Sequence, residues 1–236
     1  RSGDHRKYKV SGASSMMSSV LRIMTSGVLA GALIKTGSAQ KIAETIVDKM
    51  GQKLALAAIA LATMIICAVG VFVDISVITV APIALAIGKK AGLSKQSLLL
   101  AMIGGGKAGN IVSPNPNTIA ASEAFGVDLT SLMFKNIVPA LLALVVTILL
   151  ATLLSKKKNG LAVAQSDIES SDANLPGFLP AILGPLVVIV LLALRPIAGV
   201  TIDPLIALPA GGLICMLVTG QLKQVVKITE FGLSKV

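Results

Sequence analysis

Long apolar runs separated by short charged stretches dominate the chain. Residues 133–154, 179–194 and 205–219 are almost wholly apolar, and about 20 apolar residues suffice for a helix to cross the hydrocarbon core of a bilayer. The runs are continuous, whereas the strands of a membrane β-barrel alternate apolar and polar residues over roughly ten positions. The pattern therefore predicts an all-α integral membrane protein, folded as a helical bundle.

Two weaker elements precede these runs. Met16–Ile34 is a candidate span, although Arg22 interrupts it. In Lys35–Lys53, Ile42 and Ile46 recur at four-residue spacing with charged residues between them. Such a pattern is typical of an amphipathic helix, and we expect this one to lie at the membrane interface.

The apolar run Leu54–Gly88 is too long for one crossing. Its 35 residues would form a helix of about 52 Å, against a hydrocarbon core of about 30 Å. Lys53 precedes the run and Lys89 follows it, so the positive-inside rule places both ends in the cytoplasm. Two spans with a short loop and a re-entrant hairpin both satisfy this constraint. The poor turn signal around Asp74 favours the hairpin.

Leu98–Phe125 has the pattern of a membrane helix that is broken in the middle. Its apolar start gives way to a glycine-rich stretch at 104–110 and then to Ser-Pro-Asn-Pro-Asn-Thr at 113–118. Proline and glycine interrupt helices. Irregular backbone is tolerated at membrane depth only where it is buried in protein or lines a cavity. The sequence thus predicts a proline-broken transmembrane helix with a binding site at the break.

These elements give a predicted domain organisation of one inverted-repeat unit and the start of a second. The predicted parts are a polar N-terminal segment (1–15), a first transporter repeat (16–158, with hairpin 54–88, broken helix 98–125 and span 132–154), a cytoplasmic linker (159–178) and the start of a second repeat (179–236).

Composition and charge agree with a membrane protein. Hydrophobic residues make up 54% of the chain and charged residues 14%, against about 25% charged in a typical soluble domain. The net charge of +10 is spread between the apolar runs, and the chain has no Trp and one Tyr for stacking on bases. We therefore expect no nucleic-acid partner. Basic cytoplasmic loops explain the charge, and we expect a multi-pass protein of the cell (inner) membrane that contacts the lipid bilayer.

The chain offers little for metal, cofactor or enzymatic chemistry. Cys67 and Cys215 lie inside apolar runs, where thiols usually act as small hydrophobic groups, and the single His5 lies in the polar N-terminal segment. The glycine spacing in 104–109 matches the dinucleotide-binding fingerprint, but two prolines follow and no strand precedes it. We expect no cofactor, no metal and no enzymatic activity.

Lys107 is the first candidate for function. A charge inside a membrane segment costs at least a few kcal/mol and is a functional candidate by default, although a lysine can instead extend to the membrane edge. The broken helix would offer free N–H groups to an anion, and nearby small polar side chains could donate hydrogen bonds. The predicted substrate-binding residues are Lys107, Asn110, Ser113, Asn115, Asn117, Thr118 and Ser76.

Asp74 is the second candidate, because it is the only carboxylate in the 35-residue run. As a proton carrier or cation ligand it would couple transport of a small organic anion to a gradient of H⁺ or Na⁺. In the two-span arrangement it would instead be a solvent-exposed turn residue. Thr79 is a weaker ion-coupling candidate, since hydroxyl groups in membrane helices often bond only their own backbone.

Several segments together resemble the gluconate permease family, which belongs to a wider ion-transporter superfamily. The resemblance rests on Ser26–Gly37, Ala39–Ala43, Val71–Ser76 and Ala81–Ile83. It also includes the block 112–117, which lies where gluconate permeases carry a Pro-Pro-His-Pro-Gly type motif. The resemblance implies a site made of a hairpin and a broken helix, and proton-coupled uptake of a sugar acid.

Two departures from the family shape the expectation. The family's histidines near the broken helix are absent, and Asn115 replaces one of them, so the substrate can differ from gluconate. The family builds its site from two inverted repeats, whereas this chain offers one hairpin and one broken helix. We expect an incomplete portion of a carrier, completed by a second copy or by the remainder of the protein. The alternative is a non-transporting membrane subunit or a truncated remnant.

Overall fold

The computed structural model describes residues 2–156, 160–164 and 175–235. Within these ranges every regular element is a helix, apart from one isolated bridge between Ser94 and Ala162. The prediction of an all-α helical bundle is therefore confirmed. The acidic part of the predicted linker, 165–174, lies outside the described residues.

The described helices follow the predicted runs closely. In chain order they are α1 (Ser2–Lys35), α2 (Ser38–Met50), η1 (Gln52–Leu54), α3 (Ala55–Ala68), α4 (Val73–Lys90), α5 (Lys95–Asn110), α6 (Pro116–Phe125), α7 (Leu129–Lys135), α8 (Ile137–Ser155), α9 (Phe178–Ala198), α10 (Pro204–Val218), η3 (Leu222–Gln224) and α11 (Val225–Leu233).

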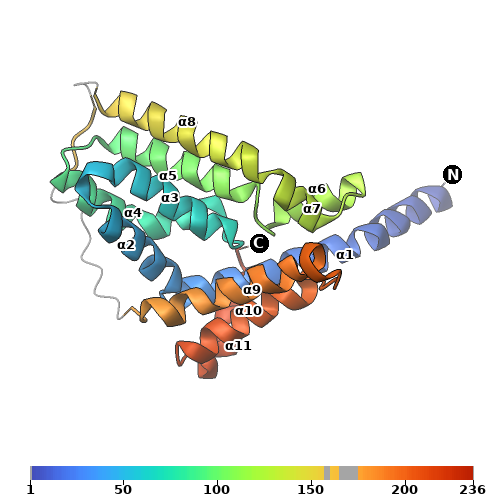
Figure 1. Ribbon diagram of the computed structural model, residues 1–236. Coiled ribbons are helices and arrows are strands. Elements are labelled where there is room, and N and C mark those ends of the chain that lie inside the picture. The colour runs from blue at the N-terminus through green and yellow to red at the C-terminus, as the bar shows by residue number, and fades with distance from the viewer. Residues whose placement is uncertain (1, 157–159, 165–174, 236) are drawn as a thin grey trace.

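The helices form two groups (Figure 1). In the first, α3, α4, α5 and α8 lie side by side, with α6 and α7 at one end; we call this the core bundle. In the second, α1 packs against α10 and α11, and α10 packs against α9; we call this the frame bundle. The helix α2 contacts both groups, since it packs against α3 and against α9.

Small residues bring α5 and α3 into unusually close contact. A Cβ atom at Gly105 would overlap the backbone carbonyl of Ala60, and one at Gly109 would overlap that of Met64. In a bilayer, helix association depends on van der Waals contact and not on exclusion of water, so small residues at a crossing increase the attraction. The glycines on which the sequence analysis placed a binding site therefore also hold the core bundle together.

The run 54–88 folds as two helices joined by a short turn. The turn occupies 69–72, where Gly70 has a φ of 110° that other residues rarely adopt. It therefore precedes Asp74, which lies in the first turn of α4. The chain enters α3 and leaves α4 at the same end of the core bundle (Figure 1), as the hairpin prediction requires. How deep the turn lies in a bilayer stays a prediction.

The predicted break in Leu98–Phe125 is confirmed. The helix α5 ends at Asn110, and α6 begins at Pro116 after five residues without regular helix. Proline is favourable at the first position of a helix because it has no N–H to leave unpaired. The predicted span 132–154 begins slightly later than expected, because Asn136 separates the short α7 from α8.

Among the described residues, α8 is the one unbroken helix long and apolar enough to cross a bilayer, and most of its surface is exposed. An exposed apolar helix of this kind suits contact with lipid. The bent pair formed by 20–35 and α2 passes the same test if counted as one span; its two parts meet at 61°. The bend lies at Gly37, which has a φ of 75°.

The predicted amphipathic helix corresponds to α2. Its buried residues include Ile42, Ala43 and Val47, which recur on one face. Near the C-terminus, the predicted spans at 179–194 and 205–219 correspond to α9 and α10. The sequence analysis assigned no helix to 225–233, where α11 packs against α1.

Candidate functional site

The start of α4 lies directly against the glycine-rich C-terminal part of α5. A Cβ atom at Gly106 would be 2.9 Å from Val73 Cγ1 and 3.5 Å from Cys67 Sγ. The Cys67 thiol donates a hydrogen bond to Ser76 Oγ at 3.1 Å, and both side chains are fully buried. The end of α3 and the start of α4 thus contact the glycine-rich part of α5. A binding site at this contact, which the family resemblance implies, stays a prediction.

Lys107 and Asp74 flank this contact. Lys107 follows Gly106 in the sequence, and Asp74 follows Val73. Both charged residues are exposed. Both charges lie within electrostatic range of Cys67. Within the described residues neither takes part in a hydrogen bond or an ion pair. The structure therefore brings one free cation and one free carboxylate to the same part of the core bundle.

The break between α5 and α6 is organised around Asn115, whose side chain is fully buried. Its Nδ2 donates to the backbone carbonyl of Asn110 at 2.6 Å, to Asn110 Oδ1 at 2.7 Å and to Ser113 Oγ at 2.6 Å. Its Oδ1 accepts from the backbone N–H groups of Asn117 and Thr118 at 2.8 and 3.2 Å. One side chain therefore closes the end of α5 and caps the start of α6.

This network occupies the N–H groups that the sequence analysis expected to face an anion. The first N–H groups of α6 bond Asn115, and Thr118 Oγ1 donates to the carbonyl of Asn110 at 3.2 Å. Asn117 alone among the predicted block residues has an exposed side chain. The structure thus brings Asn110, Ser113, Asn115 and Thr118 together as a buried structural cluster, and their predicted contact with substrate stays a prediction.

The two hydroxyls of α4 differ in their surroundings. Thr79 Oγ1 donates to the carbonyl of Ile75 at 2.8 Å, one turn earlier in its own helix. Ser76 faces Cys67 and the interior. Within the described residues no group of three or more His, Cys, Asp or Glu side chains is placed to hold a metal ion.

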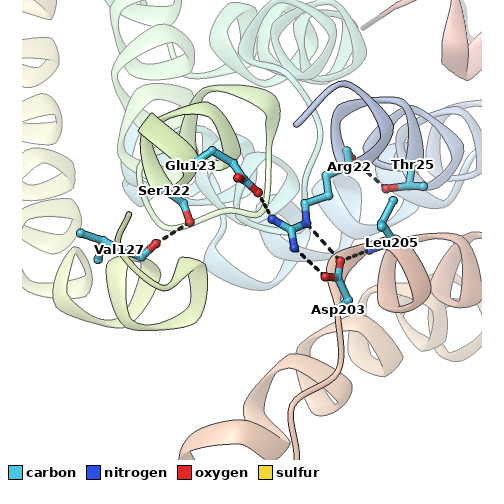
Figure 2. Close-up of polar contacts among 7 residues, drawn as sticks. All are labelled: Arg22, Thr25, Ser122, Glu123, Val127, Asp203 and Leu205. Atoms are coloured by element: carbon cyan, nitrogen blue, oxygen red, sulfur yellow. Dashed lines mark hydrogen bonds and ion pairs between the residues drawn. The ribbon is translucent and has the colours of Figure 1, made fainter. Parts of the chain in front are cut away.

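Sequence reasoning missed a second polar cluster (Figure 2). Arg22 on α1 donates from Nε to Asp203 Oδ1 at 3.2 Å and from Nη2 to Asp203 Oδ2 at 2.6 Å, and its Nη1 pairs with Glu123 on α6. The bridge therefore ties the frame bundle to the core bundle. A signal for it existed: isolated ionisable residues in or beside apolar segments usually pair with one another.

The cluster borders a cavity of about 430 Å³ whose lining includes Ser122, Asp128 and Thr201. The hydrogen bonds from Arg22, and to a lesser extent from the backbone N–H of Leu205, hold the pKa of Asp203 below its usual value of 3.8, although partial burial opposes the shift. At neutral pH Asp203 is therefore a carboxylate, and its bidentate geometry with Arg22 is the strong form of this interaction.

We expect Asn115→Ala to lower the free energy of unfolding by about 2–4 kcal/mol, because it removes a helix cap and leaves buried groups without partners. Asn115→Asp retains a capping oxygen but places a second oxygen against the carbonyl of Asn110, so it should also destabilise the protein. The midpoint of thermal unfolding of the detergent-purified protein measures both effects.

Asn117→Ala is the matched control for this prediction, because it removes the same kind of side chain from an exposed position. Asn117 bonds Asn115 through its backbone N–H, which the substitution leaves in place. Its midpoint should stay close to that of the parent protein, as for most surface substitutions. Equal loss of stability in Asn117→Ala and Asn115→Ala would contradict a structural role for the buried amide.

Comparisons with known proteins agree with these features. Residues 7–219 match the family described as GntP family permease. A Haemophilus influenzae protein named "Uncharacterized transporter" is 52% identical over 227 residues, which are 96% of this chain and 54% of that protein. A Haemophilus influenzae protein named "Uncharacterized permease" is 30% identical over 133 residues, which are 56% of this chain and 27% of that protein. No solved structure matches the chain.

The chain thus spans about half the length of the first of these relatives, with 54% covered. The family match extends from α1 to the end of α10 and includes both the hairpin and the broken helix. It relates the chain to a family of membrane permeases, and it confirms the resemblance found in the sequence. The chain belongs to the GntP permease family.

Proposed function

We propose that this chain forms part of a secondary active transporter that imports a small organic anion, such as gluconate or a related sugar acid, together with H⁺ or Na⁺. The observation that carries the proposal is the joint placement of Lys107 and Asp74 beside the contact between the hairpin and α5. In a membrane protein, charged side chains of this kind, without hydrogen-bond or ion-pair partners among the described residues, are candidates for function by default.

Lys107 is the proposed anion-binding group. Its ammonium can bond a carboxylate with a charge-assisted hydrogen bond, which is roughly twice as strong as a neutral one. The exposed amide of Asn117, just beyond the break, can add a hydrogen bond to a hydroxyl or carboxylate oxygen. The buried cluster around Asn115 fixes the ends of α5 and α6, and so positions Lys107 and Asn117.

Asp74 is the proposed ion-coupling group. A carboxylate near Lys107 can bind a proton or a sodium ion, which changes the local charge and favours arrival of the anion. Thr79, on the same helix, is the neighbouring oxygen group that we assign to this ion site, and Ser76 stays among the proposed substrate-binding residues. The coupling then follows from charge: cation and anion together leave the site more nearly neutral than either alone.

The proposed site is open on one side. Ile103 on α5 and Ile111, the residue just after that helix, are exposed at four-residue spacing on either side of Lys107. On α4, Ile78 shares the exposed face of Asp74, with 72% of its surface exposed. We propose that the remainder of the transporter, or a second copy, covers this face and completes the site.

The charge distribution suggests the orientation in a cell (inner) membrane with several crossings. Lys53 precedes α3, Lys89 lies in the last turn of α4, and Lys156 follows α8. These helix ends meet at one end of the core bundle, opposite the end with α6 and α7 (Figure 1). Because lysine is enriched in cytoplasmic loops, we propose that this end faces the cytoplasm.

Uptake of labelled gluconate into proteoliposomes holding the natural gene product tests the proposal. We expect Lys107→Gln to lower kcat/KM by about tenfold or more, since an ion-assisted contact with the anion is lost. Asp74→Asn should abolish accumulation driven by a proton or sodium gradient while exchange of internal for external substrate persists.

The matched control is Lys227→Gln, which removes a positive charge from an exposed position on α11, outside the proposed site. This substitution should leave uptake unchanged. Undiminished uptake and affinity in Lys107→Gln would remove that residue from the site. Uptake that no ion gradient drives would contradict coupling, and the absence of uptake for any small carboxylate would favour a non-transporting subunit.

A further inference from the structure

A hollow of about 370 Å³ lies between the start of α3 and the end of α8. Lys53 and Lys156 lie on its rim, and Leu56, Leu93 and Ile148 are among the apolar residues of its walls. Both lysines are exposed, whereas Leu56 is buried. The hollow therefore combines a basic rim with an apolar interior.

A second hollow of about 330 Å³ adjoins the first. The two share Leu93, Ser155 and Lys156, and the second adds Lys89 and Ser94. No Asp or Glu is among the described residues that line either of them. The combined surface, which we call the basic hollow, is thus lined by three lysines and three hydroxyl groups, and none of its described lining residues is a carboxylate.

The position of the basic hollow on the bundle limits what can occupy it. The helix α8 forms one wall, and leucines on the same helix at 149, 150 and 153 have half or more of their surface exposed. These leucines face the hydrocarbon region of a bilayer if α8 crosses it. The hollow therefore opens where lipid chains end and headgroups begin, and a molecule that fits it has both an apolar and an anionic part.

From this geometry we infer that the basic hollow is a binding site for an anionic phospholipid. The phosphate of the headgroup lies between Lys53 and Lys156, and one acyl chain lies against Leu56, Leu93 and Ile148. Basic pockets between membrane helices on the cytoplasmic side recognise anionic headgroups in this way. This site lies at the lysine-rich end of the core bundle and uses none of the residues proposed for transport.

Binding of lipid to the purified chain in a neutral detergent tests the inference. Phosphatidylglycerol and phosphatidylcholine with the same acyl chains are titrated separately, and bound lipid is counted by native mass spectrometry. We expect tight binding of phosphatidylglycerol only. Lys53→Gln with Lys156→Gln should weaken it about 25-fold, because each lysine contributes about fivefold at an anionic lipid surface.

The matched control is Lys223→Gln with Lys227→Gln, which removes the same charge from η3 and α11, outside the hollow. Phosphatidylglycerol should bind this control as it binds the parent. Equal weakening in both double variants would overturn the site, because general surface charge would then explain the binding. Equal binding of phosphatidylcholine by the parent would overturn the assignment to an anionic headgroup.

Two further measurements test the apolar half of the site. Ala57→Phe fills the wall of the hollow without a change in charge and should weaken phosphatidylglycerol binding, whereas unchanged binding would overturn the placement of the acyl chain. Glycerol 3-phosphate and inorganic phosphate should not displace the lipid at millimolar concentration. Displacement by either would show a phosphate site, and would overturn the assignment to a lipid.

Discussion

Replacement of Gly105 and Gly109 together by alanine is expected to abolish the native packing of the core bundle. Each new Cβ atom would overlap a backbone carbonyl of α3, not a movable side chain, so the two helices must separate along their whole contact. Overpacking of this kind typically costs about 1–3 kcal/mol at a single position. Two positions on one crossing should leave little folded protein at physiological temperature.

The measurement is size-exclusion chromatography of a fluorescent fusion in detergent, as a function of temperature, since the chain has no Trp and one Tyr to report unfolding. Gly177→Ala is the matched control: its Cβ atom would meet Pro180 Cδ at 3.5 Å, an ordinary contact, and its φ is not positive. We expect the control to elute as the parent does. A stable, monodisperse double variant would contradict the close approach of α5 to α3.

The second large effect is expected for Arg22→Leu. The substitution leaves Glu123 and Asp203 facing each other, each about one-third exposed, at 28% and 36%. Exposed ion pairs contribute about 0–1 kcal/mol, and removal of one partner from a buried pair costs about 3–5 kcal/mol. For partly buried groups we expect a loss of about 1–3 kcal/mol in the free energy of unfolding, measured by the same melting experiment.

Neutralisation of Glu123 and Asp203 distinguishes two causes of the expected loss of stability: repulsion between the two carboxylates and the lost packing of the Arg22 side chain. Arg22→Leu combined with Glu123→Gln and Asp203→Asn should recover most of the lost stability, because no unpaired charge remains. The matched control combines Arg22→Leu with Glu230→Gln, which neutralises an exposed carboxylate on α11. This control should recover none of the lost stability. Full stability in Arg22→Leu alone would mean that the bridge does not hold α6 to α1 and α10.

The pH dependence of the same bridge has a definite sign. Because the pKa of Asp203 is lowered from 3.8 in the folded protein, its contribution to stability is complete above about pH 4 and is lost as the pH falls further. The difference in stability between the parent and Arg22→Leu should therefore be constant from about pH 8 to pH 5 and shrink below about pH 4. A difference that grows in acid would contradict the assignment.

The sequence predicted the helical elements well because bilayer physics constrains them strongly. A run as long as 54–88 cannot be one span, and prolines at 114 and 116 cannot continue a helix, so the hairpin and the break followed from length and residue type. The turn at 69–72 was harder to locate. Its signal is a single glycine, whereas Asp74 and Ser76 drew attention to the start of the next helix.

The role of the polar block was less predictable. Hydrogen-bonding capacity is visible in a sequence, but the partner of each group is not, and Asn115 satisfies groups on both sides of the break at once. The partners of Arg22 could not be assigned from the sequence for a related reason. Its partners lie 101 and 181 residues away in sequence, and only the packing of α6 and α10 against α1 brings them together.

The buried amide of Asn115 has a consequence for how related carriers diverge. A side chain that holds five partners at the helix break is constrained by folding whatever the cargo is. The side chains of Lys107 and Asn117 do not hold the helix break together, so folding does not prevent their substitution when the substrate changes. Among homologues that keep asparagine at position 115, we therefore expect positions 107 and 117 to vary with the substrate, so that these two positions say more about specificity than the retained amide does.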